Sequence, residues 1–502
     1  MTERRHGWGE MLLPVAGLCM FFGLLATFWV GYIGSDDELY WNGATGWLAH
    51  VPYVGDSHWS LRHTMVIPIA LARRIFGDGM PALVLPVLLY ASGLISVSVI
   101  WMRRRAGRCA AIAGTVLLVT NPQFILLSST AVIDIVETFF IVIALFFLDR
   151  GMAEFSSVTG GGPGNGRDVP WRALLLAGGL AGLAMLSRET TIFAVAAVGL
   201  LFLAGYGMPR RFYCIVAAGF LAVVLGELAC LWAMTGNPLY RSTISLHHDS
   251  TINRWVDQGA GIPYVHPLVD PVVMLLLNHN FGVLTWIGVP LVFWLMRRGY
   301  LAGGARRMVV IVGTVALTWT VLAAGLWSLL PLTPRYYLLP SLGLSMLSGI
   351  ALARLWLCGR RRLASLLGTL LVSANLLALS ADNRNFMFGE HILVDLASGE
   401  PEIIHTDTET LRRAALLLHW KKMSDRVTSA LPASGDLYFF NPARSGPGPR
   451  LGPDWPVVER RDVPETGIRW LACHAMPGNA LPPAVKARLG CGRADVTLYR
   501  VP

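Results

Sequence analysis

Three consecutive carboxylates, Asp36, Asp37 and Glu38, directly follow the first long apolar run of the chain, residues 11–33. Carboxylates are costly in lipid, so acids at the mouth of a membrane helix must lie in water or in a site, and they are functional candidates by default. A solvated helix end explains a single acid, whereas a cluster favours a site. A carboxylate in such a site can act as a general base toward a hydroxyl group.

Further ionisable residues lie near the ends of later apolar runs. They are Arg62, His63, Asp134, Glu137, Arg188, Glu189 and Arg335, with Tyr336 directly after the last. Arginine binds phosphate oxygens with two parallel hydrogen bonds and stays charged at any ordinary pH. A transfer from a lipid-linked phosphosugar needs a base for the acceptor hydroxyl and cations for the departing phosphate, so this combination indicates that chemistry. Arginines at a membrane rim can also simply reach lipid headgroups.

Two of these acids and three histidines have alternative interpretations. Asp134 and Glu137 share a helix face at i, i+3, so they are cavity residues or a structural pair inside the bundle. His63, His247 and His248 are candidate ligands of a divalent metal ion, although histidines in wet loops are usually solvated.

Composition places the chain in a membrane. Of its 502 residues, 54% are hydrophobic and only 14% are charged, whereas soluble chains carry about 25% charged residues. The net charge of +10 comes from short arginine clusters between apolar runs, which is typical of a positive-inside topology and not of a nucleic-acid partner. Residues 11–33 are too long for a signal-peptide core and end in acid, so they are predicted to be a retained first span.

Arginine clusters follow every second apolar run, with few arginines between them. This alternation predicts about eleven spans, with the N-terminus in the cytoplasm and the C-terminus outside. Residues 34–79 form the first outer loop, in which the apolar stretch 63–76 is too short to span and fits an interfacial helix. Residues 173–186 and 191–204 are predicted as two helices that meet at a polar turn.

The tail differs in composition from the rest. We predict a transmembrane domain over residues 1–381 and a small extracytoplasmic α/β domain over residues 382–502. The tail has helical spacing at 410–420, strand patterns at 436–440, 468–472 and 496–501, and a proline- and glycine-rich loop at 442–456. If the tail is outside the cytosol, Cys473 and Cys491 can form a disulfide. The fold class is therefore an α-helical polytopic membrane protein with a small α/β domain.

The order of these landmarks resembles the GT-C integral membrane glycosyltransferases, and within them the protein mannosyltransferase and lipid A aminoarabinose transferase group. The resemblance is carried by the acidic first outer loop with Asp-Asp-Glu-Leu-Tyr, then Leu61-Arg62-His63 before an interfacial stretch. The segment from Asn121-Pro122 to Asp134, the Arg-Glu-Thr turn at Arg188, and Pro334-Arg335-Tyr336 are similar to later landmarks. The resemblance covers residues 10–380.

This resemblance implies a sugar donor on polyprenyl phosphate and transfer on the extracytoplasmic side. The acceptor is a lipid, glycan or protein hydroxyl, and some members use a divalent metal. Asp37 matches the first-loop aspartate that acts as the base, with Asp36 as an offset alternative. His63 stands where the family has His or Lys before two prolines, which this chain lacks. The resemblance also implies a multi-pass protein of the bacterial inner membrane.

The sequence thus favours a membrane glycosyltransferase with Asp37 as the base. Two other classes remain open at this point: a transporter or flippase for a lipid-linked sugar, and a non-catalytic membrane protein that presents its C-terminal domain to a partner. The embedded charges lie near the predicted outer surface, whereas a transporter tends to place such groups near the bilayer centre.

Overall fold

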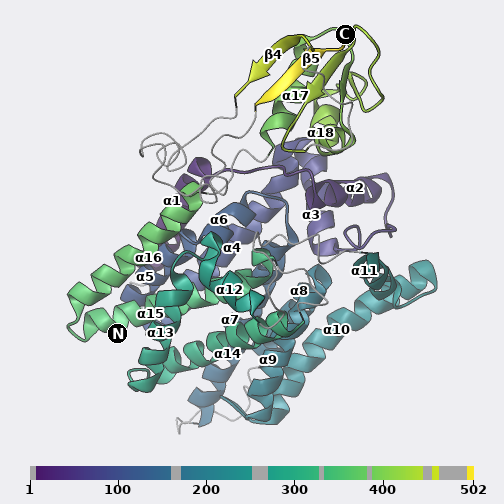
Figure 1. The fold of residues 1–502 in the computed structure, drawn as a ribbon. Coiled ribbons are helices and arrows are strands. Elements are labelled where there is room, and N and C mark those ends of the chain that lie inside the picture. The colour runs from purple at the N-terminus through teal and green to yellow at the C-terminus, as the bar shows by residue number, and fades with distance from the viewer. Residues whose placement is uncertain are drawn as a thin grey trace.

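The structure is a computed structural model that describes residues 7–159, 171–251, 269–326, 333–381, 387–444, 455–462 and 495–502. A helical bundle makes up most of it, and a small sheet domain lies at one end of the bundle, beside helices α2 (Asp36–Ala49) and α3 (His63–Phe76) (Figure 1). We call this end of the bundle the α2 end.

Several helices have the length and composition of membrane spans. They are α4 (Met80–Ala106), α10 (Arg210–Thr235), α14 (Gly303–Gly325), α15 (Leu338–Leu357) with the short turn η3 (Pro334–Tyr337) before it, and α16 (Arg361–Ala381). The helices α5 (Arg108–Val119) and α6 (Pro122–Ser128) together have the length and composition of one further span, which is bent by 61° between them. The helical multi-span fold is confirmed. The number of about eleven spans stays a prediction.

The remaining helices complete the bundle. They are α1 (Gly7–Thr27), α7 (Ile133–Thr159), α8 (Trp171–Ser187), η1 (Glu189–Thr191), α9 (Ile192–Leu203), α11 (Tyr240–Thr251), α12 (Asp270–Leu277), η2 (His279–Phe281) and α13 (Leu284–Arg297). In the span that starts at η3, 89% of the residues in its most apolar stretch are buried, so α15 lies at the centre of the bundle. In the α10 span the share is only 17%, so α10 lies at the periphery.

The predicted break between two short helices is confirmed. Helix α8 ends at Ser187, and η1 then leads into α9. The bend between α5 and α6 was not predicted, although its cause is local. The Asn121 side chain accepts a hydrogen bond of 3.2 Å from the Phe124 N–H, and Pro122 occupies the first helical turn, a position that proline favours.

The acidic cluster begins a helix and does not close one. Helix α1 ends at Thr27, the chain is irregular up to Ser35, and α2 starts at Asp36. Acids in a first helical turn are stabilised by the positive end of the helix dipole. Helix α3 has the predicted bounds of an interfacial helix, and it buries Met65 and Ile69 while exposing Leu71 and Ile75.

At the other end of the bundle, three helices are tied together by Asp149 of α7. Its carboxylate accepts hydrogen bonds from Arg105 of α4, from Arg307 of α14 at 2.6 Å and from Trp101 at 2.9 Å. The aspartate is 1% exposed. Both oxygens are occupied, so this acid has a structural role.

The C-terminal domain carries a five-stranded sheet in the order β2-β1-β3-β5-β4. Its elements are α17 (Phe388–Gly399), β1 (Ile404–Thr406), α18 (Thr408–Lys421), β2 (Val427–Thr428), β3 (Leu437–Phe440), β4 (Val457–Arg461) and β5 (Val496–Arg500). Strand β1 is parallel to β2 and β3, while β5 is antiparallel to β3 and β4.

The predicted helix 410–420 and the predicted strands 436–440 and 496–501 correspond to α18, β3 and β5, whereas β1, β2 and β4 were not predicted. The predicted strand 468–472, most of the loop 442–456, and the cysteines Cys473 and Cys491 lie outside the described residues.

Helices α8 and α10 pack with their backbones in close contact. A Cβ atom added to Gly178 would lie 1.9 Å from the Val216 carbonyl oxygen, and one added to Gly219 would lie 2.3 Å from the Leu175 carbonyl oxygen. Small residues at such crossings let membrane helices approach closely. This contact holds α8, and with it the turn at Arg188, against α10.

We expect Gly219→Ala to destabilise the protein by about 1–3 kcal/mol, because the added methyl group overlaps backbone atoms that cannot move away easily. Gly226→Ala is the matched control, since it lies on the same helix and its Cβ would have no atom within 4 Å. Thermal unfolding in detergent measures both. Equal melting temperatures for the two variants would contradict the close packing.

Candidate active site

The first turn of α2 sends the three consecutive carboxylates into different surroundings. Successive residues of an α-helix point about 100° apart, since a turn takes about 3.6 residues. Asp36 turns toward Arg335 of η3, with 17% of its side chain exposed. Asp37 is fully buried, and Glu38 lies in the field of Arg412 on α18. The three acids therefore cannot act as one cluster.

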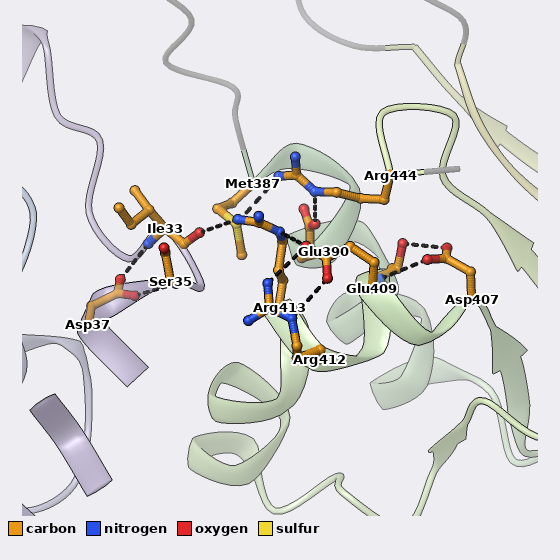
Figure 2. Close-up of polar contacts among 11 residues, drawn as sticks. Ile33, Ser35, Asp37, Met387, Glu390, Asp407, Glu409, Arg412, Arg413 and Arg444 are labelled. Atoms are coloured by element: carbon orange, nitrogen blue, oxygen red, sulfur yellow. Dashed lines mark hydrogen bonds and ion pairs between the residues drawn. The ribbon is translucent and has the colours of Figure 1, made fainter. Parts of the chain in front are cut away.

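Asp37 is bound by the backbone around it. Its Oδ2 accepts a hydrogen bond from the Ile33 N–H at 2.6 Å, and its Oδ1 accepts one from the Ser35 N–H at 2.7 Å (Figure 2). Its Oδ1 also accepts from the Glu38 N–H at 3.1 Å. Burial raises the pKa of Asp37 to about 6, although these three N–H groups act to lower it. Asp37 therefore anchors the turn into α2, and both of its oxygens accept hydrogen bonds from the backbone.

Asp36 faces a group of arginines. It forms an ion pair of 2.9 Å with Arg335, whose side chain is 35% exposed. Burial acts to raise the pKa of Asp36, but Arg335, then Arg62 and Arg188, outweigh it, and the pKa lies below its usual range. Tyr40 lies one turn after Asp36 on the same face of α2 and accepts a hydrogen bond from the Arg62 guanidinium. Asp36 is thus the carboxylate that faces the arginines predicted to bind the donor phosphate.

Arg188 connects this group to α7. It forms a buried ion pair with Asp134, and its guanidinium lies 4.1 Å from the centre of the Tyr336 ring. Glu137, one turn after Asp134, accepts hydrogen bonds from the hydroxyls of Thr190 at 2.7 Å and Thr191 at 2.8 Å. The second oxygen of Asp134, Oδ2, is buried without a hydrogen-bond partner in the part of the chain that the structure describes.

Glu189 belongs to a second network. Arg241 of α11 binds it at 2.8 Å and also binds Glu227 of α10 at 3.0 Å. The Arg241 guanidinium donates to the carbonyl oxygens of Leu186 at 2.8 Å and Met185 at 3.2 Å as well. Burial acts to lower the pKa of Arg241, but the two glutamates raise it above its usual value. Arg241 therefore fixes the end of α8, from which Arg188 projects.

The predicted metal ligands do not form a site within the described residues. There, no group of three or more His, Cys, Asp or Glu side chains is placed to hold a metal ion. His63 packs edge-to-face on Trp47, with ring centres 5.7 Å apart. Burial, then Arg241, lowers its pKa to about 4. His247 is exposed on α11, and the side chain of His248 lies outside the described residues.

Sequence reasoning missed three residues of the site. Tyr40 could have been found from its i, i+4 spacing to Asp36 on a helix. Arg241 lies on α11, in a polar segment between apolar runs, and no local sequence pattern marks it. Gln123 donates a hydrogen bond of 2.7 Å to the Pro334 carbonyl oxygen and thereby fixes η3. That contact joins residues 211 positions apart, so only the tertiary structure shows it.

Comparison with known proteins supports the same architecture. Residues 64–232 match the sequence family described as dolichyl-phosphate-mannose-protein mannosyltransferase. These residues include Asp134, Glu137 and Arg188, but not Asp36, Asp37 or Arg335. No curated protein matches the chain in sequence.

Solved structures match the chain over most of its length. ArnT from Cupriavidus metallidurans bound to undecaprenyl phosphate has a TM-score of 0.53 and 13% identity, covering 96% of this chain and 97% of that one. The archaeal oligosaccharyltransferase AglB from Archaeoglobus fulgidus, in complex with an inhibitory peptide and a dolichol-phosphate, has a TM-score of 0.53 and 14% identity. That match covers 82% of this chain and 64% of AglB.

Both relatives have the GT-C fold, and this chain has it too. The predicted fold class and the resemblance to the mannosyltransferase and ArnT-like group are confirmed. The Archaeoglobus oligosaccharyltransferase has also been solved in complex with Zn and sulfate, with a TM-score of 0.50 and 15% identity, covering 83% of this chain and 62% of that one.

We expect Asp37→Asn to loosen the turn into α2. An amide oxygen can still accept from Ser35 and Glu38, but the amide nitrogen would face the Ile33 N–H, donor against donor. This mismatch should lower the free energy of unfolding by about 1–3 kcal/mol. Hydrogen exchange measured by mass spectrometry should speed up in peptides that contain Ile33, while the exposed Asp56→Asn serves as control. Unchanged exchange in Asp37→Asn would remove its anchoring role.

Proposed function

We propose that this protein transfers a sugar from a polyprenyl-phosphate donor to a hydroxyl group of a lipid, glycan or protein acceptor, with Asp36 as the general base. The observation that carries the proposal is the ion pair of 2.9 Å between Asp36 and Arg335, with Arg62 and Arg188 near enough to act on the same carboxylate. The family match and the shared fold support this reaction class.

The reaction needs one base and one anion site. The acceptor oxygen gives its proton to Asp36 and attacks the anomeric carbon of the sugar, and the bond from that carbon to the phosphate oxygen breaks. The polyprenyl phosphate leaves with the bonding electrons and is held by Arg335, Arg188 and Arg62. Asp36 pairs with Arg335. A donor phosphate that binds the same arginine competes with this carboxylate and frees it to accept a proton.

This assignment replaces Asp37 by its neighbour. The sequence motif alone favoured Asp37, but in the structure its carboxylate accepts three backbone N–H groups and is fully buried. A base must come within hydrogen-bond reach of the proton that it takes. We therefore propose that Asp37 positions Asp36.

An apolar cavity supports a lipid-linked donor. Its volume is about 390 Å³, and it lies among α7, α8, α9 and α10, where Leu145, Val198 and Phe220 line it. Thr191 lines it as well and donates to Glu137, one turn from the Asp134–Arg188 pair. An isoprenoid chain in this cavity would place its phosphate toward the arginines.

The proposed setting follows the predicted topology. The likeness to ArnT from Cupriavidus metallidurans supports a bacterial inner-membrane protein. The arginine alternation supports an N-terminus in the cytoplasm, so the α2 end would face the outside. We propose residues 1–381 as the catalytic membrane domain and residues 382–502 as the extracytoplasmic domain.

We expect Asp36→Asn to cut turnover by roughly 10²–10⁴ with little change in donor binding, because it removes the base and keeps the shape. Mass spectrometry of lipids and glycans from cells lacking the protein identifies the missing product, and each variant is scored by how much product it restores. Purified variants are tested for undecaprenyl phosphate binding. Asp37→Asn should lose less activity than Asp36→Asn. Full restoration by Asp36→Asn would favour a transporter or flippase.

Arg335→Ala and Arg188→Ala should weaken undecaprenyl phosphate binding by roughly 10-fold or more, since a hydrogen bond to a charged group contributes about 1.5–3 kcal/mol. Arg335→Lys should recover part of the loss, because lysine cannot bind two oxygens in a fork. Arg150→Ala is the control: it removes an exposed arginine of α7 that pairs with Glu154. Equal affinities for all variants would contradict the anion site.

A further inference from the structure

Helix α18 of the C-terminal domain packs directly on the segment that leads into α2. Arg413 of α18 donates a hydrogen bond of 3.1 Å to the carbonyl oxygen of Ile33. The N–H of Ile33 in turn donates a hydrogen bond of 2.6 Å to Asp37. Ile33 is therefore bound on one side by the C-terminal domain and on the other by the residue that anchors the turn (Figure 2).

The approach between the two segments is close enough to involve backbone atoms. Gly34 has a left-handed φ of +61°, and a Cβ atom there would lie 2.9 Å from the Arg413 Cβ and 3.0 Å from its Cα. Only glycine adopts this conformation at no steric cost. The chain at Gly34 is thus shaped to fit against α18.

Aromatic side chains extend this contact to both flanks of the acidic cluster. Trp420, in the last turn of α18, packs edge-to-face on Tyr32 and on Trp41, with ring centres 5.7 Å and 5.1 Å apart. Tyr32 is 0% exposed and Trp41 is 2% exposed. Such pairs contribute about 0.5–1.5 kcal/mol beyond the area that they bury. Tyr32 precedes Asp36 and Trp41 follows it, so α18 holds the chain on either side.

Helix α18 has the internal support that a rigid element needs. Asp407 caps its first turn by accepting hydrogen bonds from the Thr410 N–H at 2.9 Å and from the Thr410 hydroxyl at 2.6 Å. Glu409 accepts from Arg413 at 2.5 Å and from Arg412 at 2.8 and 2.9 Å. Arg413 is thereby held by its own helix while it binds Ile33.

We propose that α18 is a positioning element of the active site: Arg413 and Trp420 hold the chain through Ile33 and Tyr32 so that Asp37 stays bound and Asp36 faces Arg335. This inference rests on the proposed function, because it assumes that Asp36 is the base. A displacement of about 1 Å of a reacting group can cost about 10²-fold in rate. Arg413 touches no reacting atom in this arrangement and acts through Ile33 and Asp37.

The full-length protein tests this with three variants of α18. Arg413→Ala removes the bond to Ile33, and Arg413→Lys keeps a donor that can reach it. Lys421→Ala is the control, because it removes an exposed cation from the last turn of the same helix. Hydrogen exchange at the Ile33–Glu38 segment, product restored in cells lacking the protein, and undecaprenyl phosphate affinity are measured for each.

We expect Arg413→Ala to speed hydrogen exchange in this segment and to lower product formation roughly 10-fold or more. The affinity for undecaprenyl phosphate should change less than about twofold, because the arginines proposed to bind phosphate lie on other elements. Arg413→Lys should recover most of the loss, and Lys421→Ala should behave as wild type. Wild-type exchange and product formation in Arg413→Ala would overturn the proposal. So would a parallel loss of product and affinity without recovery by lysine, since that is the result of general unfolding.

The exchange measurement does not depend on the reaction. A faster exchange in Arg413→Ala together with full activity of Asp36→Asn would contradict the proposed function and the role of Asp36, while the contact between α18 and the acidic segment would stand. The two proposals therefore fail separately.

Discussion

The carboxylate of Asp37 and the three backbone N–H groups that it accepts hold together the region on which the proposed chemistry depends. They bind the irregular chain after α1 to the first turn of α2, and so they set the rotation of that helix. With that rotation, Asp36 and Tyr40 share the face that meets Arg335 and Arg62. Burying a carboxylate costs free energy unless it is hydrogen-bonded, and here the three backbone N–H groups supply those hydrogen bonds and order the turn at the same time.

The bundle buries charge at both ends, but the two ends differ in how completely it is satisfied. Asp149 has both oxygens bound, by Arg307, Arg105 and Trp101. At the α2 end, Oδ2 of Asp134 and Nε of Arg62 have no partner among the described residues. Unpaired buried polar atoms are destabilising, so these two atoms support the proposal that a ligand binds at the α2 end. The Asp149 network needs no ligand to satisfy its carboxylate.

Local patterns in the sequence predicted much of the fold. The short helix at His63–Phe76 and the paired helices around Arg188 follow from apolar run lengths and polar breaks, which are local properties. The bend at Asn121 was missed even though its cap and proline are also local. In the C-terminal domain, β1 and β2 escaped prediction because they are only three and two residues long. A strand so short has too few residues to show a period.

The sequence by itself determined the candidate residue types and the GT-C resemblance, because these follow from composition, order and hydropathy. Only the tertiary structure decided which aspartate meets the arginines. Asp36 and Asp37 are adjacent in the chain, yet they point about 100° apart on a helix. Asp36 pairs with Arg335, 299 positions away, whereas Asp37 is bound by local N–H groups, and Arg413 holds one of these residues, Ile33, from 380 positions away. Such long-range contacts form by packing, which no local pattern records.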